Sequence, residues 1–412
     1  MKRFFATWRH VAGAFALFGA LLLGVSVGER AAGADAPESI RIGYSIQLSG
    51  WASQGARAST LPNYQLWVKD VNDAGGIYLS KYDKKVPIEV VEYDNGSKME
   101  NAVRDIERLI IKDEVDFVLP PWGTAFNMAV APLFEQYGYP LFPATAAVPE
   151  GLNTQDYPNV LWFTFSAEGL CAPLVDVLAT AHAEGKINNK VALVNVADTF
   201  GVEMAKAVAP MFREAGFEIV YEKNYPLNVQ DLTPLLNEIR QTDADSFVSM
   251  SYPADTMMWT EQARIAQYNP KVFYAAVGTA FPFFKGKFGE GVEGVMGYGG
   301  WNPDIPGARE YIQRHAALAG HEPDRGASLA TFASVQVLQQ AIEQVGEIDR
   351  QATRDAIAAG TFETVIGPVS FSDDLTIESL FVVGQWQNGQ FRGVGPSDKA
   401  GAAALVVPKQ SW

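Results

Sequence analysis

Residues 40–50 read IRIGYSIQLSG, an apolar strand over residues 40–46 that ends in a turn. A helical pattern follows and is expected to stop within DVNDAGGI at residues 70–77. The order of strand, loop and helix places this loop at the carboxyl end of a first parallel strand, where open α/β sheets bind small molecules. The sequence therefore predicts a ligand cleft beside this turn.

Strand and helix patterns alternate along the rest of the chain. Ser97 is expected to cap a helix whose apolar side chains recur at helical spacing up to Ile110, and residues 115–119 form the next buried strand. A second set begins at Lys190, with expected strands over 191–196, 217–221 and 247–250 and helices over 202–215 and from Thr233. Two such sets predict an α/β fold with two parallel sheets, each covered by helices on both faces.

Three segments are expected to cross between the two halves of the fold, namely residues 157–165, 294–301 and 364–374. Helical patterns return over 308–318 and 328–345, and a final antiparallel pair, 380–387 and 390–392, is joined at Asn388-Gly389. Each lobe is then discontinuous in sequence. We expect residues 35–162 and 300–366 to form the first lobe, and residues 163–299 and 367–412 to form the second.

The N-terminus has the features of an export signal. Lys2, Arg3 and Arg9 precede an apolar stretch over residues 11–27, and Ala32-Gly33-Ala34 offers small residues for cleavage before Asp35. An uncleaved membrane anchor is the alternative interpretation. Residues 1–34 hold four basic side chains and one acidic side chain, so cleavage lowers the net charge from -15 to -18. So acidic a surface repels nucleic acid phosphates, and we expect an exported monomer with no nucleic acid partner.

The side chains of catalytic and metal sites are scarce. Cys171 is the one cysteine, so no internal disulfide can form, and we interpret it as a buried apolar residue. Beyond the export signal the histidines are His182, His315 and His321, which we expect at the surface and not at metal-ligand spacing. The stretch GEGVEG at residues 289–294 fits a nucleotide-binding pattern, but its two acids would repel a pyrophosphate, so we interpret it as a turn. We therefore expect no enzymatic activity, no metal and no cofactor.

Several of these segments resemble one family, the type I periplasmic solute-binding proteins of ABC transporters, in particular the branched-chain amino acid and amide group. The segments that carry the resemblance are IRIGYSIQLSG at 40–50, VKDVNDAGGI at 68–77, Gly201 after Asp198, GPVSF at 367–371, and residues 382–387. The resemblance implies two Rossmann-like lobes, joined by three crossing segments, that close over a ligand in the cleft between them. It also implies a partner permease in the inner membrane and a periplasmic location.

The resemblance implies the first set of site residues. In the first lobe, Thr124 and the neighbouring amides of Gly123 and Ala125 would hold a ligand carboxylate, and Ala144-Thr145 would supply a second polar contact. Thr124 also has the position of a plain helix cap. In the second lobe, Phe200 and Tyr252 would form aromatic walls.

Three tryptophans, Trp51, Trp122 and Trp301, are expected on loops that could face the cleft, although packing in the core is an equally good interpretation for each. Amino acid receptors of this family carry an acid that pairs with the ligand's ammonium group, in a loop that here reads VGTAF at 277–281, with Thr279 at its centre. Because this loop has no acid, the sequence favours a small organic carboxylate with an aromatic or apolar body. An amino acid or amide receptor, and a periplasmic sensor that partners a kinase, are the alternatives.

Overall fold

The computed structural model of the chain describes residues 35–164, 166–301, 307–377 and 380–412. The expected signal peptide, residues 1–34, and Phe165 in the first expected crossing lie outside the described residues. No helix in the described ranges is long and apolar enough to span a membrane.

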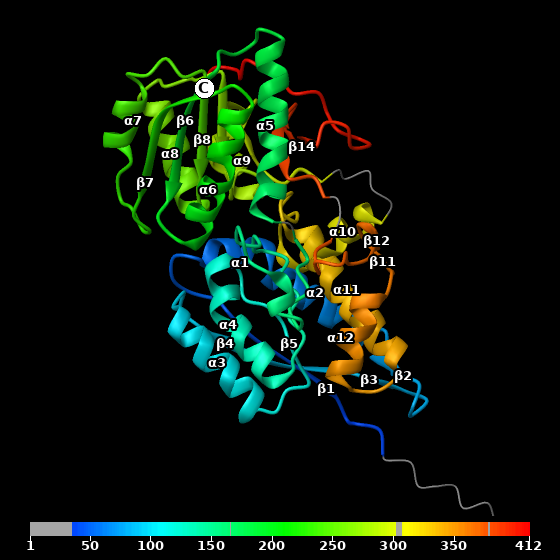
Figure 1. Cartoon of the computed structure of the whole chain (residues 1–412). Coiled ribbons are helices and arrows are strands. Elements are labelled where there is room, and N and C mark those ends of the chain that lie inside the picture. The colour runs from blue at the N-terminus through cyan, green and yellow to red at the C-terminus, as the bar shows by residue number, and fades with distance from the viewer. Residues whose placement is uncertain (1–34, 165, 302–306, 378–379) are drawn as a thin grey trace, which may run out of the picture. The chain divides into compact units, whose positions relative to one another are not determined.

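The first lobe is built around a parallel sheet with the strand order β4-β1-β5 in the described ranges (Figure 1). Its strands are β1 (Ile40–Ile46), β4 (Ile88–Asp94) and β5 (Phe117–Val118). Six of the seven residues of β1 are buried, as expected for a parallel strand covered on both faces. The helices of its N-terminal part are α1 (Ser53–Ser59), α2 (Leu61–Asp73), α3 (Met99–Ile111) and α4 (Thr124–Tyr137), followed by the short 3-10 helix η1 (Thr154–Asp156).

The chain returns to this lobe after residue 307. The returning helices are α10 (Ala308–Ala319), α11 (Ser328–Val345) and α12 (Arg350–Ala359), followed by the small hairpin of β11 (Phe362–Thr364) and β12 (Gly367–Val369). A second small hairpin, β2 (Ile77–Leu79) with β3 (Lys84–Val86), comes from the N-terminal part of the lobe. Helices α10 and α11 pack on α2. The hydroxyl of Tyr311 donates a 2.6 Å hydrogen bond to Asn63, and Arg314 pairs with Asp70. The lobe is therefore discontinuous in sequence.

The second lobe holds a larger sheet with the order β14-β13-β10-β9-β8-β6-β7 among the described strands. Pairing is parallel from β10 to β7, whereas β13 lies antiparallel to β10 and to β14. Its strands are β6 (Lys190–Val196), β7 (Glu218–Tyr225), β8 (Ser246–Met250), β9 (Val272–Ala275), β10 (Met296–Tyr298), β13 (Val383–Gln387) and β14 (Gln390–Gly395). Its helices are α5 (Ala167–Ala183), α6 (Thr199–Glu214), α7 (Thr233–Ile239), α8 (Pro253–Ile265), α9 (Pro282–Phe288) and the short η2 (Gly289–Val292). The expected final hairpin at Asn388-Gly389 is confirmed.

The sequence predicted one helix after the first turn, but the structure has two, α1 and α2. The break falls at Thr60, and Pro62 lies in the first turn of α2. Proline has no N–H to donate and fits the first helical turn, where that donor has no partner within the helix. The segment over residues 157–164, expected to be extended, makes only single bridges, at Val160 and Trp162.

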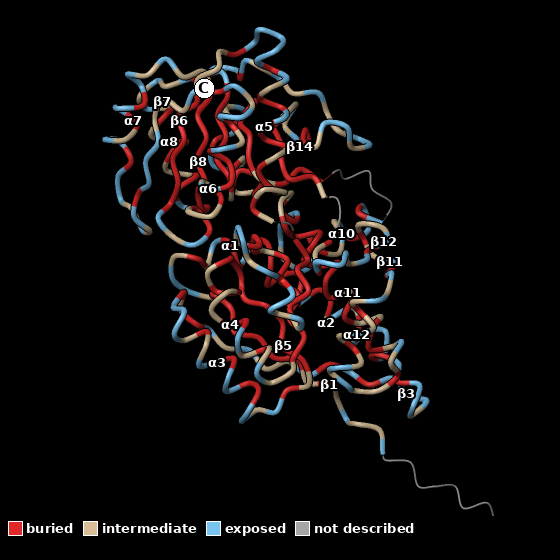
Figure 2. The backbone as a smooth tube through the Cα atoms, viewed as in Figure 1, coloured by how far each residue is buried: buried red, intermediate tan, exposed pale blue. Residues whose placement is uncertain are grey.

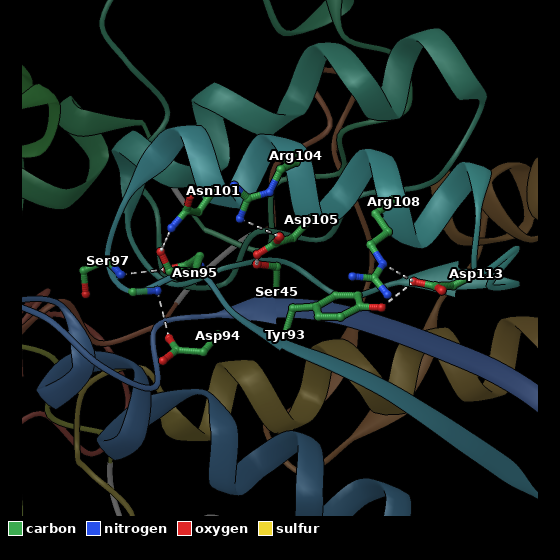
Figure 3. Close-up of polar contacts among 11 residues, drawn as sticks. Ser45, Tyr93, Asp94, Asn95, Ser97, Asn101, Arg104, Asp105, Arg108 and Asp113 are labelled. Carbon is green, nitrogen blue, oxygen red and sulfur yellow. Dashed lines mark hydrogen bonds and ion pairs between the residues drawn. The ribbon is translucent and has the colours of Figure 1, made fainter.

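Ser97 does not cap α3, contrary to the prediction. Ser97 has a φ of 58°, and Lys98 occupies the cap position. The Ser97 hydroxyl instead donates to the Ser49 carbonyl at 2.6 Å and accepts from the Ala52 N–H at 3.1 Å. Figure 3 shows the turn that fixes this conformation, in which the Asn95 side chain accepts from the Ser97 N–H. Ser97 thus holds the loop after β1 in place.

Residues coloured as buried run along the strands of both sheets (Figure 2). Cys171 is buried, as expected. His315 was expected at the surface, but it is fully buried, with Nδ1 3.3 Å from the His321 carbonyl and its ring against Tyr311. The sequence around His315 did not predict this burial, because it depends on the packing of α10 against other helices of its own lobe.

Candidate functional site

A cavity lies where the two lobes meet. Its lining comes from both lobes and from the loop before α11, and consists of Ser59, Trp122, Gly123, Thr124, Thr145, Ala146, Ala147, Leu170, Phe200, Met204, Tyr252, Tyr274, Ala276, Val277, Gly278, Phe281, Tyr298, Gly326 and Ala327. None of these side chains carries a charge. The cavity therefore offers hydroxyls, backbone amides and apolar or aromatic surface to a ligand.

The first-lobe wall is formed by the start of α4. Gly123 is the N-cap residue, with a φ of 93° that favours glycine, so the expected cap role of Thr124 was wrong. The first N–H groups of a helix have no partner within it and lie at the positive end of the helix dipole. Those of Thr124 and Ala125 are therefore suited to an anion.

Two hydroxyls support this helix terminus. Oγ1 of Thr124 accepts from the Ala147 N–H at 3.0 Å, and Oγ1 of Thr145 accepts from the Gly123 N–H at 3.3 Å. A hydroxyl that accepts still carries its own proton, which it can donate to a ligand. Upstream, the Gln47 side-chain amide donates to the Trp122 carbonyl at 2.8 Å and accepts from the Trp122 N–H at 3.2 Å. The end of β1 thus positions the loop after β5.

Tyr252 is the centre of the aromatic wall. Its ring stacks on Phe200 of the same lobe, with centroids 5.2 Å apart, and contacts the first-lobe rings of Trp51 at 5.1 Å and Trp122 at 5.4 Å. Tyr252 follows β8 and precedes α8, whereas Phe200 lies in the first turn of α6. Loops after two different strands therefore bring these rings together, and Tyr252 joins the two lobes.

Buried carboxyl groups lie behind the lining and not in it. Asp198 accepts from the Tyr252 hydroxyl at 2.7 Å and from the Gly201 N–H at 3.0 Å, and burial raises the pKa of its carboxyl. Asp324 accepts from the N–H groups of Gly326 and Ala327, at 2.7 and 2.8 Å, and burial raises its pKa to about 6. Both carboxyls are occupied by donors of the protein itself.

The structure brings six of the expected site residues into the lining, namely Trp122, Gly123, Thr124, Thr145, Phe200 and Tyr252. Trp51 lies outside the lining, between Tyr252 and Phe126. Thr279 is buried and donates to the Ala275 carbonyl at 2.7 Å. Trp301 is also buried; its indole N–H donates to the Asp324 carbonyl at 3.0 Å, and the Arg325 guanidinium stacks on its ring. Ala125 and Ala144 flank the lining without belonging to it.

Sequence reasoning missed much of the second-lobe wall. Leu170, Met204, Tyr274, Phe281 and Tyr298 line the cavity from α5, α6, β9, the start of α9 and β10. Tyr274 lies on β9, a strand buried along its whole length, so the sequence pattern could not separate this cavity-lining side chain from a core side chain.

A sequence profile of the family described as periplasmic binding protein matches residues 39–390, more than four fifths of the chain. The chain belongs to this family. The expected resemblance to type I periplasmic binding proteins of the branched-chain amino acid group is thereby confirmed. The family consists of solute-binding proteins and not of enzymes. Among the described residues, no group of histidine, cysteine and acidic side chains could hold a metal ion.

Individual periplasmic binding proteins show the same likeness. The chain is 24% identical over 413 residues to Leu/Ile/Val-binding protein homolog 7 of Brucella suis biovar 1, covering 94% of this chain and 99% of that protein. The fold matches that of a solute-binding protein from R. palustris in complex with benzoate, with a TM-score of 0.75 at 17% identity over 89% of this chain and 99% of the other. It also matches LivJ of Streptococcus pneumoniae in complex with isoleucine, with a TM-score of 0.73 at 23% identity, covering 90% of this chain and 100% of LivJ. At these identities the structures establish the two-lobe fold alone.

Proposed function

We propose that this chain is the periplasmic substrate-binding component of an ABC importer and binds one small organic carboxylate with an aromatic or apolar body. The observation that carries the proposal is the lining of the cavity, which combines a helix terminus and two hydroxyls at one wall with rings and no charged side chain elsewhere. The fold neighbours bind solutes of two kinds, benzoate and isoleucine, and the lining favours the first kind.

The carboxylate would lie against the start of α4. There it would accept from the N–H groups of Thr124 and Ala125 and from the hydroxyls of Thr124 and Thr145, contacts that need no cation. The body of the ligand would lie among the rings of Trp122, Phe200 and Tyr252.

An α-ammonium group has no counterpart in this lining. A buried ammonium without a paired carboxylate costs several kcal/mol. The two carboxyls behind the wall, Asp198 and Asp324, already accept hydrogen bonds from the protein. The proposal therefore separates this chain from receptors for free amino acids.

Binding would be coupled to lobe closure, because a ligand in the cavity would touch Trp122 of the first lobe and Tyr252 of the second, and it can touch both only when the lobes meet. A permease in the inner membrane could then distinguish loaded from empty protein. The export signal expected from the sequence and the family both support a periplasmic location.

Three measurements test this function. Mass spectrometry of small molecules released from the natively purified protein should find a monocarboxylic acid, and calorimetric titration with benzoate should show saturable 1:1 binding without turnover. Uptake of labelled benzoate by cells lacking the gene should fall below that of the parent strain. Consumption of the ligand, or unchanged uptake together with altered signalling, would contradict a transport role.

A further inference from the structure

Two tyrosines form the part of the second-lobe wall that the proposed carboxylate site leaves unexplained. Tyr274 lies on β9 and Tyr298 on the neighbouring strand β10, and both line the cavity. Tyr274 pairs in register with Met296, and the Tyr298 N–H donates to the Ala276 carbonyl at 2.8 Å. Tyr298 is therefore two residues further along its strand than Tyr274. Because side chains alternate between the faces of a sheet, both rings lie on the same face.

Neither phenol has a hydrogen-bond partner among the described residues. The Tyr252 hydroxyl, in contrast, donates to Asp198, and that of Tyr311 donates to Asn63. Tyr268 is a useful comparison, because its hydroxyl is fully enclosed and has no partner either. The hydroxyls of Tyr274 and Tyr298 are absent from the enclosed polar atoms that lack a partner. Each therefore keeps some surface open, and for Tyr274, a residue that is only 2% exposed, the open space is the cavity.

The surroundings define what these hydroxyls could bind. Burying a hydroxyl without a hydrogen-bond partner costs free energy, so a ligand that supplies the partner binds more tightly. Burial raises the pKa of both phenols, which keeps them protonated and able to donate. No cation from the described residues lines the cavity, and the charge of the Asp324 carboxyl also raises the pKa of the Tyr298 phenol. A second carboxylate on the ligand would therefore be unfavourable here, whereas a neutral oxygen would be accepted.

We propose that Tyr274 and Tyr298 form a second polar subsite that selects carboxylates carrying a neutral hydrogen-bonding oxygen, such as a ring hydroxyl, at the end away from the carboxylate. This inference rests on the proposed function and narrows its ligand class to hydroxylated aromatic monocarboxylates and molecules of like chemistry.

The test is calorimetric titration of the full mature protein with benzoate, 3-hydroxybenzoate, 4-hydroxybenzoate and terephthalate. At least one hydroxybenzoate should bind about tenfold or more tightly than benzoate, because its hydroxyl satisfies a buried donor. Terephthalate should bind more weakly than benzoate. Equal affinities for benzoate and both hydroxybenzoates, or tight binding of terephthalate, would overturn the inference and leave the proposed carboxylate function standing. Failure of all four acids to bind would overturn both.

Variants assign the effect to the two phenols. Tyr274→Phe and Tyr298→Phe should each reduce the preference for the hydroxylated acid and together should remove it, the preference being the ratio of the affinities for the hydroxylated acid and for benzoate in the same variant. Tyr268→Phe is the matched control, because it removes a buried hydroxyl without a partner that does not line the cavity. It should keep the wild-type preference. Survival of the preference in a folded double variant would refute the assignment, and if the double variant does not fold, each single variant must show a partial loss.

Discussion

The hydroxyl of Tyr252 donates a 2.7 Å hydrogen bond to Oδ2 of Asp198. The pair joins the loop after β8 to the start of α6, and the Tyr252 ring contacts Trp51 and Trp122 of the other lobe. One hydrogen bond thus fixes the orientation of the ring that connects the two halves of the site.

Tyr252→Phe should distinguish the contribution of the Tyr252 hydrogen bond from that of its ring. We expect the free energy of unfolding to fall by about 1–3 kcal/mol, because a buried carboxyl loses a donor. Ligand affinity should fall less than in Tyr252→Ala, which also removes the aromatic wall. Urea unfolding and calorimetry check both effects. Tyr268→Phe should not lower the free energy of unfolding, and an equal loss in both phenylalanine variants would argue against a role for the Asp198 contact.

Thr124→Ala should weaken binding of a carboxylate by about tenfold, because the ligand loses a hydroxyl donor and the Ala147 N–H loses its acceptor. Thr124→Ser keeps the hydroxyl and should restore most of the affinity. Thr353→Ala is the control, since that hydroxyl is buried without a partner in α12, away from the cavity. Wild-type affinity in Thr124→Ala would exclude the start of α4 as the carboxylate site.

Gly55→Ala should disturb the site through Trp122. A Cβ at residue 55 would lie 2.2 Å from Cζ2 of the Trp122 indole, so the ring must move. We expect a loss of about 1–3 kcal/mol in the free energy of unfolding, together with weaker binding and altered tryptophan fluorescence. Gly286→Ala in α9 meets no atom within 4 Å and should be neutral or stabilising by up to about 1 kcal/mol. A stable Gly55→Ala variant with unchanged affinity would show that the position of Trp122 does not matter.

His315 should make the folded state sensitive to acid. Burial lowers its pKa to about 4, whereas the unfolded chain binds the proton near pH 6.5. Between these values the unfolded state binds more protons, so the contribution of His315 to the free energy of unfolding falls as the pH drops, by up to about 3 kcal/mol.

Asp255 and Asp324, whose pKa values burial raises to about 6, act in the opposite direction. The prediction is therefore tested on the difference in the free energy of unfolding between the wild type and His315→Gln. Both proteins contain Asp255 and Asp324, so the contributions of these two acids cancel in that difference. Urea unfolding at pH 7, 5.5 and 4.5 should show this difference shrinking with acidity. A difference that stays constant over this range would mean that His315 titrates alike in both states.

The repeating elements were predictable because local patterns determine them. The spacing of apolar side chains gave α11 over residues 328–345, and Asn388-Gly389 gave the final hairpin. The first-lobe half of the lining, Trp122 to Thr124, follows from the rule that loops after parallel strands meet at one edge.

The remaining errors involve contacts between distant segments. Ser97 has the sequence position of a helix cap, but its hydroxyl donates to the Ser49 carbonyl of a loop distant in sequence. For Trp301 the sequence left cleft and core equally open, and only the contacts of its indole with Asp324 and Arg325 distinguish the two. Tyr274 could not be distinguished from a core residue, because a strand buried on both faces shows no alternation of polar and apolar side chains.

The most direct measurement compares ligands that differ only by the α-ammonium group, namely phenylalanine with 3-phenylpropanoate and leucine with 4-methylpentanoate, by calorimetric titration of the wild-type protein. Because the lining has no acid, the account predicts that each desamino acid binds about tenfold or more tightly than its amino acid. Tighter binding of phenylalanine or leucine would contradict it.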